Sequence, residues 1–241
     1  MRENRKILLF LLALGLWAQG AIAATIIPIH GFNTLEGLTF AGENVSPDAT
    51  MALAPDPENP AETVLKLDFT FLENGVSFPA VRIDAPKVNY YFGTFGLWVY
   101  ANNTKNPLCI RLKDSKGEVF QSTICSLDWQ GWQYKEWPLE AYASHWGGET
   151  DGKLDLPLEV ALHVDRGNAG TVYFKGLQLQ VEQGIISGQV RNMLGQPAAG
   201  VRVLLEREGQ VLVETLADNN GAYSLLASPG EYTLKFSQAG F

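Results

Sequence analysis

Residues 64–70 read Val64-Leu65-Lys66-Leu67-Asp68-Phe69-Thr70, and apolar and polar residues alternate along this stretch. In an extended chain Leu65, Leu67 and Phe69 share one face, and the polar residues share the other. This period of two is typical of a half-buried β-strand and does not fit a helix. The stretch therefore predicts a strand that lies with one face on a hydrophobic core.

Similar patterns recur along residues 24–183. Val160, Leu162 and Val164 share one face, and Leu177, Leu179 and Val181 alternate with Gln178 and Gln180. Residues 172 and 174 are apolar with the opposite parity, so we expect a β-bulge at Gly176. The run Phe95-Gly96-Leu97-Trp98-Val99-Tyr100 predicts a more fully buried strand, with Trp98 in the core.

Clusters of proline, aspartate, asparagine and glycine separate these runs, at residues 54–60, 102–107, 147–152 and 166–170. Many short strands separated by such turns favour an antiparallel sandwich or a jelly roll. The chain has 241 residues, of which 46% are hydrophobic and 18% charged, which is enough for two domains with cores of their own.

The first 23 residues have the pattern of a secretory signal peptide. Three basic residues precede an apolar run over residues 7–17, and Ala21-Ile22-Ala23 is a small-x-small cleavage site. The apolar run is shorter than the roughly 20 residues that a membrane span needs. We therefore expect cleavage after Ala23, a secreted or cell-surface location, and no membrane span in the mature chain.

The charge balance argues against one class of partner. The chain has 18 Lys and Arg against 26 Asp and Glu, a formal net charge of −8. An acidic surface repels the phosphate backbone, so we expect no nucleic-acid partner.

Cys109 and Cys125 flank a predicted hairpin with strands over residues 108–113 and 118–124 and a turn over residues 114–117. In an exported protein a disulfide between them is permitted, and the alternative is two free thiols. With a tight turn the two residues fall on opposite faces, so a disulfide requires a bulge or a longer loop. We take the pair as a candidate disulfide.

The order of motifs in the first part resembles a known family. A tryptophan-containing strand (95–100) and the hairpin (108–124) are followed by Asp128-Trp129-Gln130-Gly131-Trp132 and by a closing segment over residues 170–177. This order resembles the galactose-binding-like jelly rolls that serve as carbohydrate-binding modules in exported glycan-active proteins. The resemblance implies a jelly-roll β-sandwich over residues 24–183 and a glycan ligand. It also implies a structural calcium near the chain ends, with Asp165 and Glu182 as candidate ligands. We expect no other cofactor.

Residues 184–241 have a sharper pattern of short strands and glycine turns. Val201, Val203 and Leu205 line one strand face, and Tyr232, Leu234 and Phe236 line another. Together with the turns at Gly195-Gln196-Pro197 and Asp218-Asn219-Asn220-Gly221, these strands closely resemble the carboxypeptidase regulatory-like domain. The resemblance implies a small prealbumin-like Greek-key β-sandwich without catalytic residues. That family has one further strand after the final Gly-aromatic pair, so we expect this domain to be incomplete.

Aromatic residues crowd the loop-like segment 137–148, and sugar rings stack their apolar faces on tryptophan and tyrosine. We take Trp146, Trp137, Tyr142 and His145 as candidate ligand-binding residues. Trp146 is the first choice for stacking because Gly147 and Gly148 leave its ring accessible. Core packing is the alternative for both tryptophans, since large aromatics are usually buried.

No catalytic or metal motif appears in the sequence. His30, His145 and His163 are widely spaced, and neither H-x-x-x-H nor C-x-x-C occurs. His163 alternates with Leu162 and Val164, so we expect a solvent-facing or structural histidine. We therefore predict no enzyme, but an exported carbohydrate-binding module with a β-sandwich spacer. The alternatives are a structural or adhesive cell-surface protein and the accessory N-terminal part of a larger secreted hydrolase.

Overall fold

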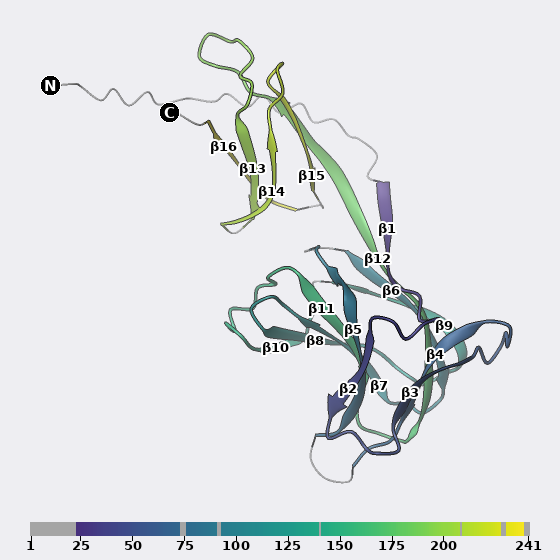
Figure 1. Cartoon of the computed structure of the whole chain (residues 1–241). Helices are drawn as coiled ribbons and strands as arrows, with labels where there is room; N and C mark the ends of the chain where they lie inside the picture. The colour runs from purple at the N-terminus through teal and green to yellow at the C-terminus, as the bar shows by residue number, and fades with distance from the viewer. Residues whose placement is uncertain are drawn as a thin grey trace. The chain divides into compact units, whose positions relative to one another are not determined.

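The computed structural model describes residues 23–72, 76–90, 93–139, 141–207, 209–227 and 230–238. All regular elements in these ranges are β-strands (Figure 1). The strands form two compact units, of which one is Ile26–Val181 and the other runs on from Glu182. Among the described residues there is no helix that is long and apolar enough to cross a membrane. The predicted signal peptide lies outside the described residues, except for Ala23.

Two sheets form the sandwich of the first unit (Figure 1). The six-stranded sheet has the order β10 (Ser144–Gly147), β8 (Glu118–Ser126), β7 (Pro107–Lys113), β11 (Leu158–Val164), β5 (Phe78–Val88), β2 (Leu38–Glu43). The path of the seven-stranded sheet is β3 (Thr50–Pro55), β4 (Thr63–Phe69), β12 (Gly170–Gln189), β6 (Thr94–Asn102), β9 (Gln130–Pro138). β12 also pairs with β1 (Ala23–His30) and with β15 (Ala222–Ala227). The antiparallel pairing confirms the predicted all-β sandwich.

Alternation places the core between the two sheets. Leu65, Leu67 and Phe69 of β4 are buried, and Lys66 and Asp68 on the other side of the strand form an ion pair of 2.7 Å. The predicted bulge at Gly176 is confirmed, because the register of β12 against β6 shifts between Lys175 and Gln178. Gly176 has a φ of 64°, a conformation that glycine adopts without steric cost. The extra residue of the bulge switches which alternate residues of β12 face the core. Val172 and Phe174 therefore face the core before the bulge, and Leu177, Leu179 and Val181 face it after the bulge.

Trp98 is not in the core, and the prediction for this residue is wrong. Its side chain is 42% exposed on the outer face of the seven-stranded sheet, where its ring lies 5.3 Å from that of Tyr134. The neighbours Leu97 and Val99 are fully buried, so β6 does alternate. The prediction failed because an aromatic residue on the outer face of β6 made the whole run look apolar.

The second unit is built on a small sheet with the order β14 (Gln210–Leu216), β13 (Arg202–Arg207), β16 (Thr233–Ser237). β15 pairs with residues 184–189 of β12. The predicted apolar face of β13 is confirmed, since Val201, Val203 and Leu205 are buried in a separate core. The predicted row Tyr232, Leu234 and Phe236 packs against the same core.

The loop after β3 is fixed to the seven-stranded sheet by Asp56, whose side chain is 1% exposed. The carboxylate accepts hydrogen bonds from the Trp132 indole at 2.9 Å, from Lys175 Nζ at 2.8 Å and from the Glu58 backbone N–H at 2.8 Å. Burial alone raises the pKa of Asp56, but these hydrogen bonds outweigh burial and lower its pKa from 3.8 to about 2.

This depressed pKa predicts a specific acid sensitivity. Ionised Asp56 stabilises the fold above about pH 4, and the contribution is lost as the pH falls from about 4 to about 2, because the pKa of this group is lower in the folded state than in the unfolded state. A shift of nearly two pKa units corresponds to roughly 2 kcal/mol. Urea unfolding of wild type and Asp56→Asn should therefore show a large difference in stability at neutral pH and a small one near pH 2. An equal difference at both pH values would contradict this role of the carboxylate.

Candidate functional site

The outer face of the six-stranded sheet carries a group of side chains that no core packing requires. On β7, Leu108, Ile110 and Leu112 are buried between the sheets, so Cys109 and Arg111 point to the other side. The register places Gln121 of β8 opposite Arg111. We call this side of the sheet the Arg111 face. It comprises the buried residues Phe78, Cys109 and His163 and the more exposed residues Arg111, Gln121, Thr123 and Trp146.

Arg111 lies at the centre of the Arg111 face. Its guanidinium lies 4.2 Å from the centroid of the Phe78 ring and 5.3 Å from that of the Trp146 ring, and its Nε donates to Gln121 Oε1 at 2.6 Å. Burial lowers the pKa of Arg111, and nearby Asp165, Glu43 and Cys109 oppose this. A guanidinium held between two aromatic rings is a preorganised donor, because little side-chain entropy remains to be lost on binding.

Trp146 belongs to the short edge strand β10 and is 40% exposed. The strand is fixed from its opposite side, where His145 Nδ1 lies 2.5 Å from the carboxylate of buried Glu118. The same carboxylate accepts the backbone N–H groups of Asp151 and Gly152 at 3.1 Å each. Gly148 allows the chain to pass close to β8, because a Cβ there would lie 2.3 Å from the Glu118 nitrogen. These contacts hold the Trp146 ring on the surface.

The other three candidate ligand-binding residues do not lie with Trp146. Trp137 is 7% exposed and stacks on Phe95 in the core at 5.2 Å, so it cannot meet a sugar. Tyr142 packs against Phe120 at 4.6 Å and donates its hydroxyl to the Gly152 carbonyl. His145 stacks on Phe120 as well. Because successive residues of a strand point to opposite faces, His145 cannot share a ligand with Trp146. The expected grouping of the four residues is therefore wrong.

The candidate disulfide is not formed, and Cys109 and Cys125 are both free. The register of the hairpin does shift between Leu108 and Cys109, yet Cys125 packs against the core while Cys109 lies on the Arg111 face beside Thr123, at 3.5 Å. Burial raises the pKa of Cys109 to about 12 and that of Cys125 to about 11. Both thiols are therefore protonated near neutral pH.

Asp165 does not lie in the surroundings that a calcium ion requires. Calcium takes about six to eight oxygen ligands, whereas the Asp165 carboxylate lies against the Cys109 thiol and the His163 ring. Glu182, the other candidate ligand, is exposed on β12 at the start of the second unit. The residues around Asp165 therefore do not fit a calcium site. Of the two alternatives expected for His163, the solvent-facing one is wrong, because the side chain is fully buried.

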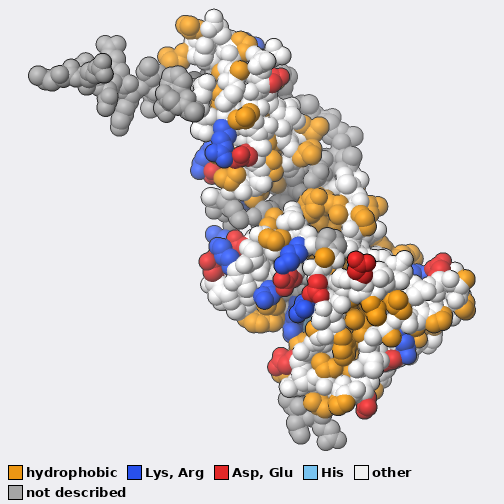
Figure 2. Space-filling view, in the orientation of Figure 1, with side chains coloured by type: hydrophobic (Ala, Val, Ile, Leu, Met, Phe, Trp, Pro, Cys, Tyr) orange, Lys and Arg blue, Asp and Glu red, His pale blue; other side chains and the backbone are white. Residues whose placement is uncertain are grey.

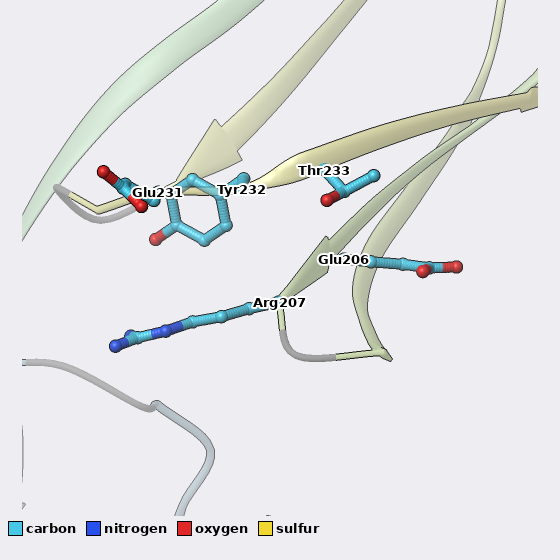
Figure 3. Close-up of a pocket in the computed structure, with 5 residues that line it drawn as sticks. All are labelled: Glu206, Arg207, Glu231, Tyr232 and Thr233. Carbon is cyan, nitrogen blue, oxygen red and sulfur yellow. The ribbon is translucent and has the colours of Figure 1, made fainter.

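The second unit contains a cavity of about 540 Å³ that is lined by Glu206, Arg207, Glu231, Tyr232 and Thr233. Figure 3 shows the Arg207 side chain extending past the Tyr232 ring, while Glu206 points the other way. Glu206 forms an ion pair with Lys235 at 2.5 Å. Burial raises the pKa of Tyr232, and nearby Arg207 opposes this, so the hydroxyl is protonated near neutral pH. The described lining of the cavity mixes charges of both signs.

The first unit is similar in fold to solved carbohydrate-binding modules. A family 11 module from Clostridium thermocellum, in complex with a beta-1,3-1,4-mixed-linked tetrasaccharide, has 12% sequence identity and a TM-score of 0.50, with 66% of this chain and 96% of that chain covered. The first unit has the fold of carbohydrate-binding modules. The family 11 module of the cellulosomal cellulase Lic26A-Cel5E of Clostridium thermocellum has 13% identity and a TM-score of 0.49, with 66% and 95% covered. A family 29 carbohydrate-binding module variant has 13% identity and a TM-score of 0.42, with 66% and 92% covered.

Residues 185–241 match the family model of the carboxypeptidase regulatory-like domain, as the glycine turns and alternating strands predicted. A search of curated proteins found no match.

Sequence reasoning missed Arg111, Gln121 and Phe78 as members of the candidate site. A signal was present, because the alternation of 108–113 assigns Arg111 to the face opposite Leu108, Ile110 and Leu112. The pairing of this face with Trp146 was not readable, because it depends on the position of β10 at the edge of the sheet.

Proposed function

We propose that the first unit is a non-catalytic carbohydrate-binding module and that the Arg111 face binds the glycan. One observation carries this proposal. An exposed tryptophan is held beside a stacked guanidinium and an amide, on one sheet face of a sandwich that has the fold of carbohydrate-binding modules.

The chemistry of the Arg111 face matches that of a sugar chain. The flat apolar face of a pyranose ring stacks on an exposed indole, and hydroxyl groups require donors and acceptors nearby. Trp146 supplies the apolar surface, Arg111 supplies N–H donors, and Gln121 supplies both a donor and an acceptor. Acidic Asp165 and Glu43 lie near the positive charge of Arg111, so we expect a neutral glycan rather than a strongly charged one. Basic and acidic side chains are also interspersed on the side of the molecule that Figure 2 shows.

The rest of the chain fits an exported modular protein. We propose that residues 1–23 direct export and are removed, that residues 24–183 form the binding module, and that residues 184–241 form a spacer. The signal-peptide pattern supports export, and the match to a regulatory-like domain supports the spacer role. A reading frame that continued into further sandwich modules would instead favour an adhesive protein. A catalytic domain in that continuation would favour a hydrolase of which this chain is the accessory part.

Binding to a glycan panel tests the proposed function. We expect the purified full chain to bind at least one neutral polysaccharide in affinity electrophoresis, and neutral β-glucans are the first probes. We also expect no release of reducing ends on prolonged incubation, because the side chains that make up the Arg111 face do not include the pair of carboxylates with which glycosidases cleave sugars. Migration unchanged by every neutral and acidic polysaccharide tested would contradict the binding function. Release of reducing ends would contradict the non-catalytic one.

A further inference from the structure

Three side chains that can ligate a metal meet at the Arg111 face, and they come from two parts of the chain. Cys109 lies on β7, His163 on β11, and Asp165 directly after β11. The Cys109 sulfur, a His163 ring nitrogen and an Asp165 carboxylate oxygen all lie within 4.8 Å of one another. Cys109 Sγ is 3.5 Å from Asp165 Oδ2, and His163 Nε2 is 3.1 Å from Asp165 Oδ1.

His163 is the second, independent observation. Its side chain is fully buried, and within the described ranges neither ring nitrogen has an aligned hydrogen-bond partner. His163 Nε2 lies 3.1 Å from Asp165 Oδ1, which is within the distance of an ion pair. The two groups are not aligned for a hydrogen bond, however. Leaving a buried polar group unsatisfied costs about 1–3 kcal/mol, so such groups point to a ligand, an ion or a water. Burial lowers the pKa of His163, which keeps the ring neutral and able to ligate.

Two of the separations suit a tetrahedral zinc-like ion. With metal–sulfur bonds of about 2.3 Å and metal–nitrogen or metal–oxygen bonds of about 2.0–2.1 Å, ligand atoms around such an ion lie roughly 3.3–3.5 Å apart. The separations of 3.5 Å from Cys109 Sγ to Asp165 Oδ2 and of 3.1 Å from His163 Nε2 to Asp165 Oδ1 are close to these values. The three ligand atoms lie within 4.8 Å of one another, so a bound ion would draw them slightly closer together. We propose that Cys109, His163 and Asp165 bind a divalent transition metal of the zinc class, a function beyond the glycan binding proposed for the Arg111 face.

Charge and access also suit a metal ion. A thiolate and a carboxylate together neutralise a divalent cation, so Arg111 nearby faces no net positive charge when the site is filled. The Asp165 side chain is 40% exposed, which leaves an approach for the ion and for a water as fourth ligand. Cys109 loses its thiol proton to the solvent when the metal–sulfur bond forms.

The same three residues do not form a nucleophilic triad. In such a triad the histidine lies between the nucleophile and the carboxylate, so that the ring can take the proton. Here Asp165 contacts both Cys109 and His163, and burial keeps the thiol protonated. The arrangement therefore favours metal binding over cysteine chemistry.

Titration of the metal-free full chain with Co²⁺ tests the proposal, because a thiolate bound to Co²⁺ gives a charge-transfer absorption that no carboxylate or imidazole gives. We expect this absorption to saturate at one Co²⁺ per chain and to be lost when Zn²⁺ displaces Co²⁺. Cys109→Ser should remove it. Asp165→Asn should keep the absorption but weaken Co²⁺ affinity by roughly tenfold or more, because it removes one of the three ligands and even the loss of a group that only supports a ligand has an effect of this size.

Cys125→Ser is the matched control, since Cys125 packs on the core side of the same hairpin. It should leave the absorption unchanged, and circular dichroism should show that both serine variants fold. The proposal is overturned if wild type shows no thiolate absorption at excess Co²⁺. It is equally overturned if Cys109→Ser retains the absorption or if Cys125→Ser loses it.

Discussion

Replacing Trp137 by alanine is expected to lower the free energy of unfolding by about 3–5 kcal/mol, as large-to-small changes in a packed core do. Trp137 is 7% exposed, and its ring stacks on Phe95 at 5.2 Å with an interplanar angle of 17°. The residue belongs to the edge strand β9, and its side chain packs in the core of the first unit, so the substitution leaves a cavity there. Urea unfolding of the full chain, followed by circular dichroism, measures the change.

Trp98→Ala is the matched control, because it removes the same side chain from the outer face of the neighbouring strand β6. Trp98 is 42% exposed and contacts Tyr134, so we expect a loss of about 1 kcal/mol or less. If the two variants lost the same free energy of unfolding, the difference in burial between Trp137 and Trp98 would not account for their contributions to stability. A larger loss for Trp98→Ala would restore the core position that the sequence predicted.

Trp146→Ala is expected to weaken glycan binding by about 1–3 kcal/mol, a common cost of truncating a hot-spot aromatic. That range corresponds to roughly 5–150-fold in the dissociation constant. The exposed ring would supply the apolar surface on which a sugar stacks, and its loss would also leave Arg111 with only one aromatic neighbour. The unfolding free energy should change by about 1 kcal/mol or less, because the ring is 40% exposed. Isothermal titration calorimetry measures the affinity, and urea unfolding measures the stability.

The β-sandwich was predictable because period-two alternation is a local property. Leu65, Leu67 and Phe69 show it directly, and the parity change around Gly176 even located a bulge. The regulatory-like domain was predictable for the same reason, since its turns require glycine at fixed positions between alternating strands. These features depend on neighbouring residues only.

Burial of individual tryptophans was less predictable. Trp98 was expected in the core, and Trp137 was taken as a candidate sugar-binding residue with core packing as its alternative, because an aromatic residue suits both a core and the outer face of a sheet. The register in which β9 pairs with β6 decides which residues of β9 face the core and therefore which ring is buried. This register cannot be read from the sequence. The loop-like appearance of the segment 137–148 concealed that Trp137 ends one strand and Trp146 belongs to another.

Of the residues in the candidate site, the sequence predicted only Trp146, as an exposed ring that could stack on a sugar. Arg111 and Gln121 meet because β7 and β8 pair in one register, and Cys109 meets His163 because β7 and β11 pair in another. No sequence spacing reveals such a cluster, since its members lie on strands that are distant along the chain. The search for H-x-x-x-H and C-x-x-C patterns could find only ligands that are close in sequence.

The most direct test of glycan binding by the Arg111 face is one calorimetric titration series, in which wild type, Trp146→Ala and Trp98→Ala are titrated with the polysaccharide that wild type binds best. The two exposed tryptophans lie on the outer faces of opposite sheets, so each variant is the control for the other. We predict that Trp146→Ala loses about 1–3 kcal/mol of binding free energy and that Trp98→Ala binds as wild type does. If Trp98→Ala lost the binding while Trp146→Ala retained it, the glycan would bind on the seven-stranded sheet and the Arg111 face would not be the site.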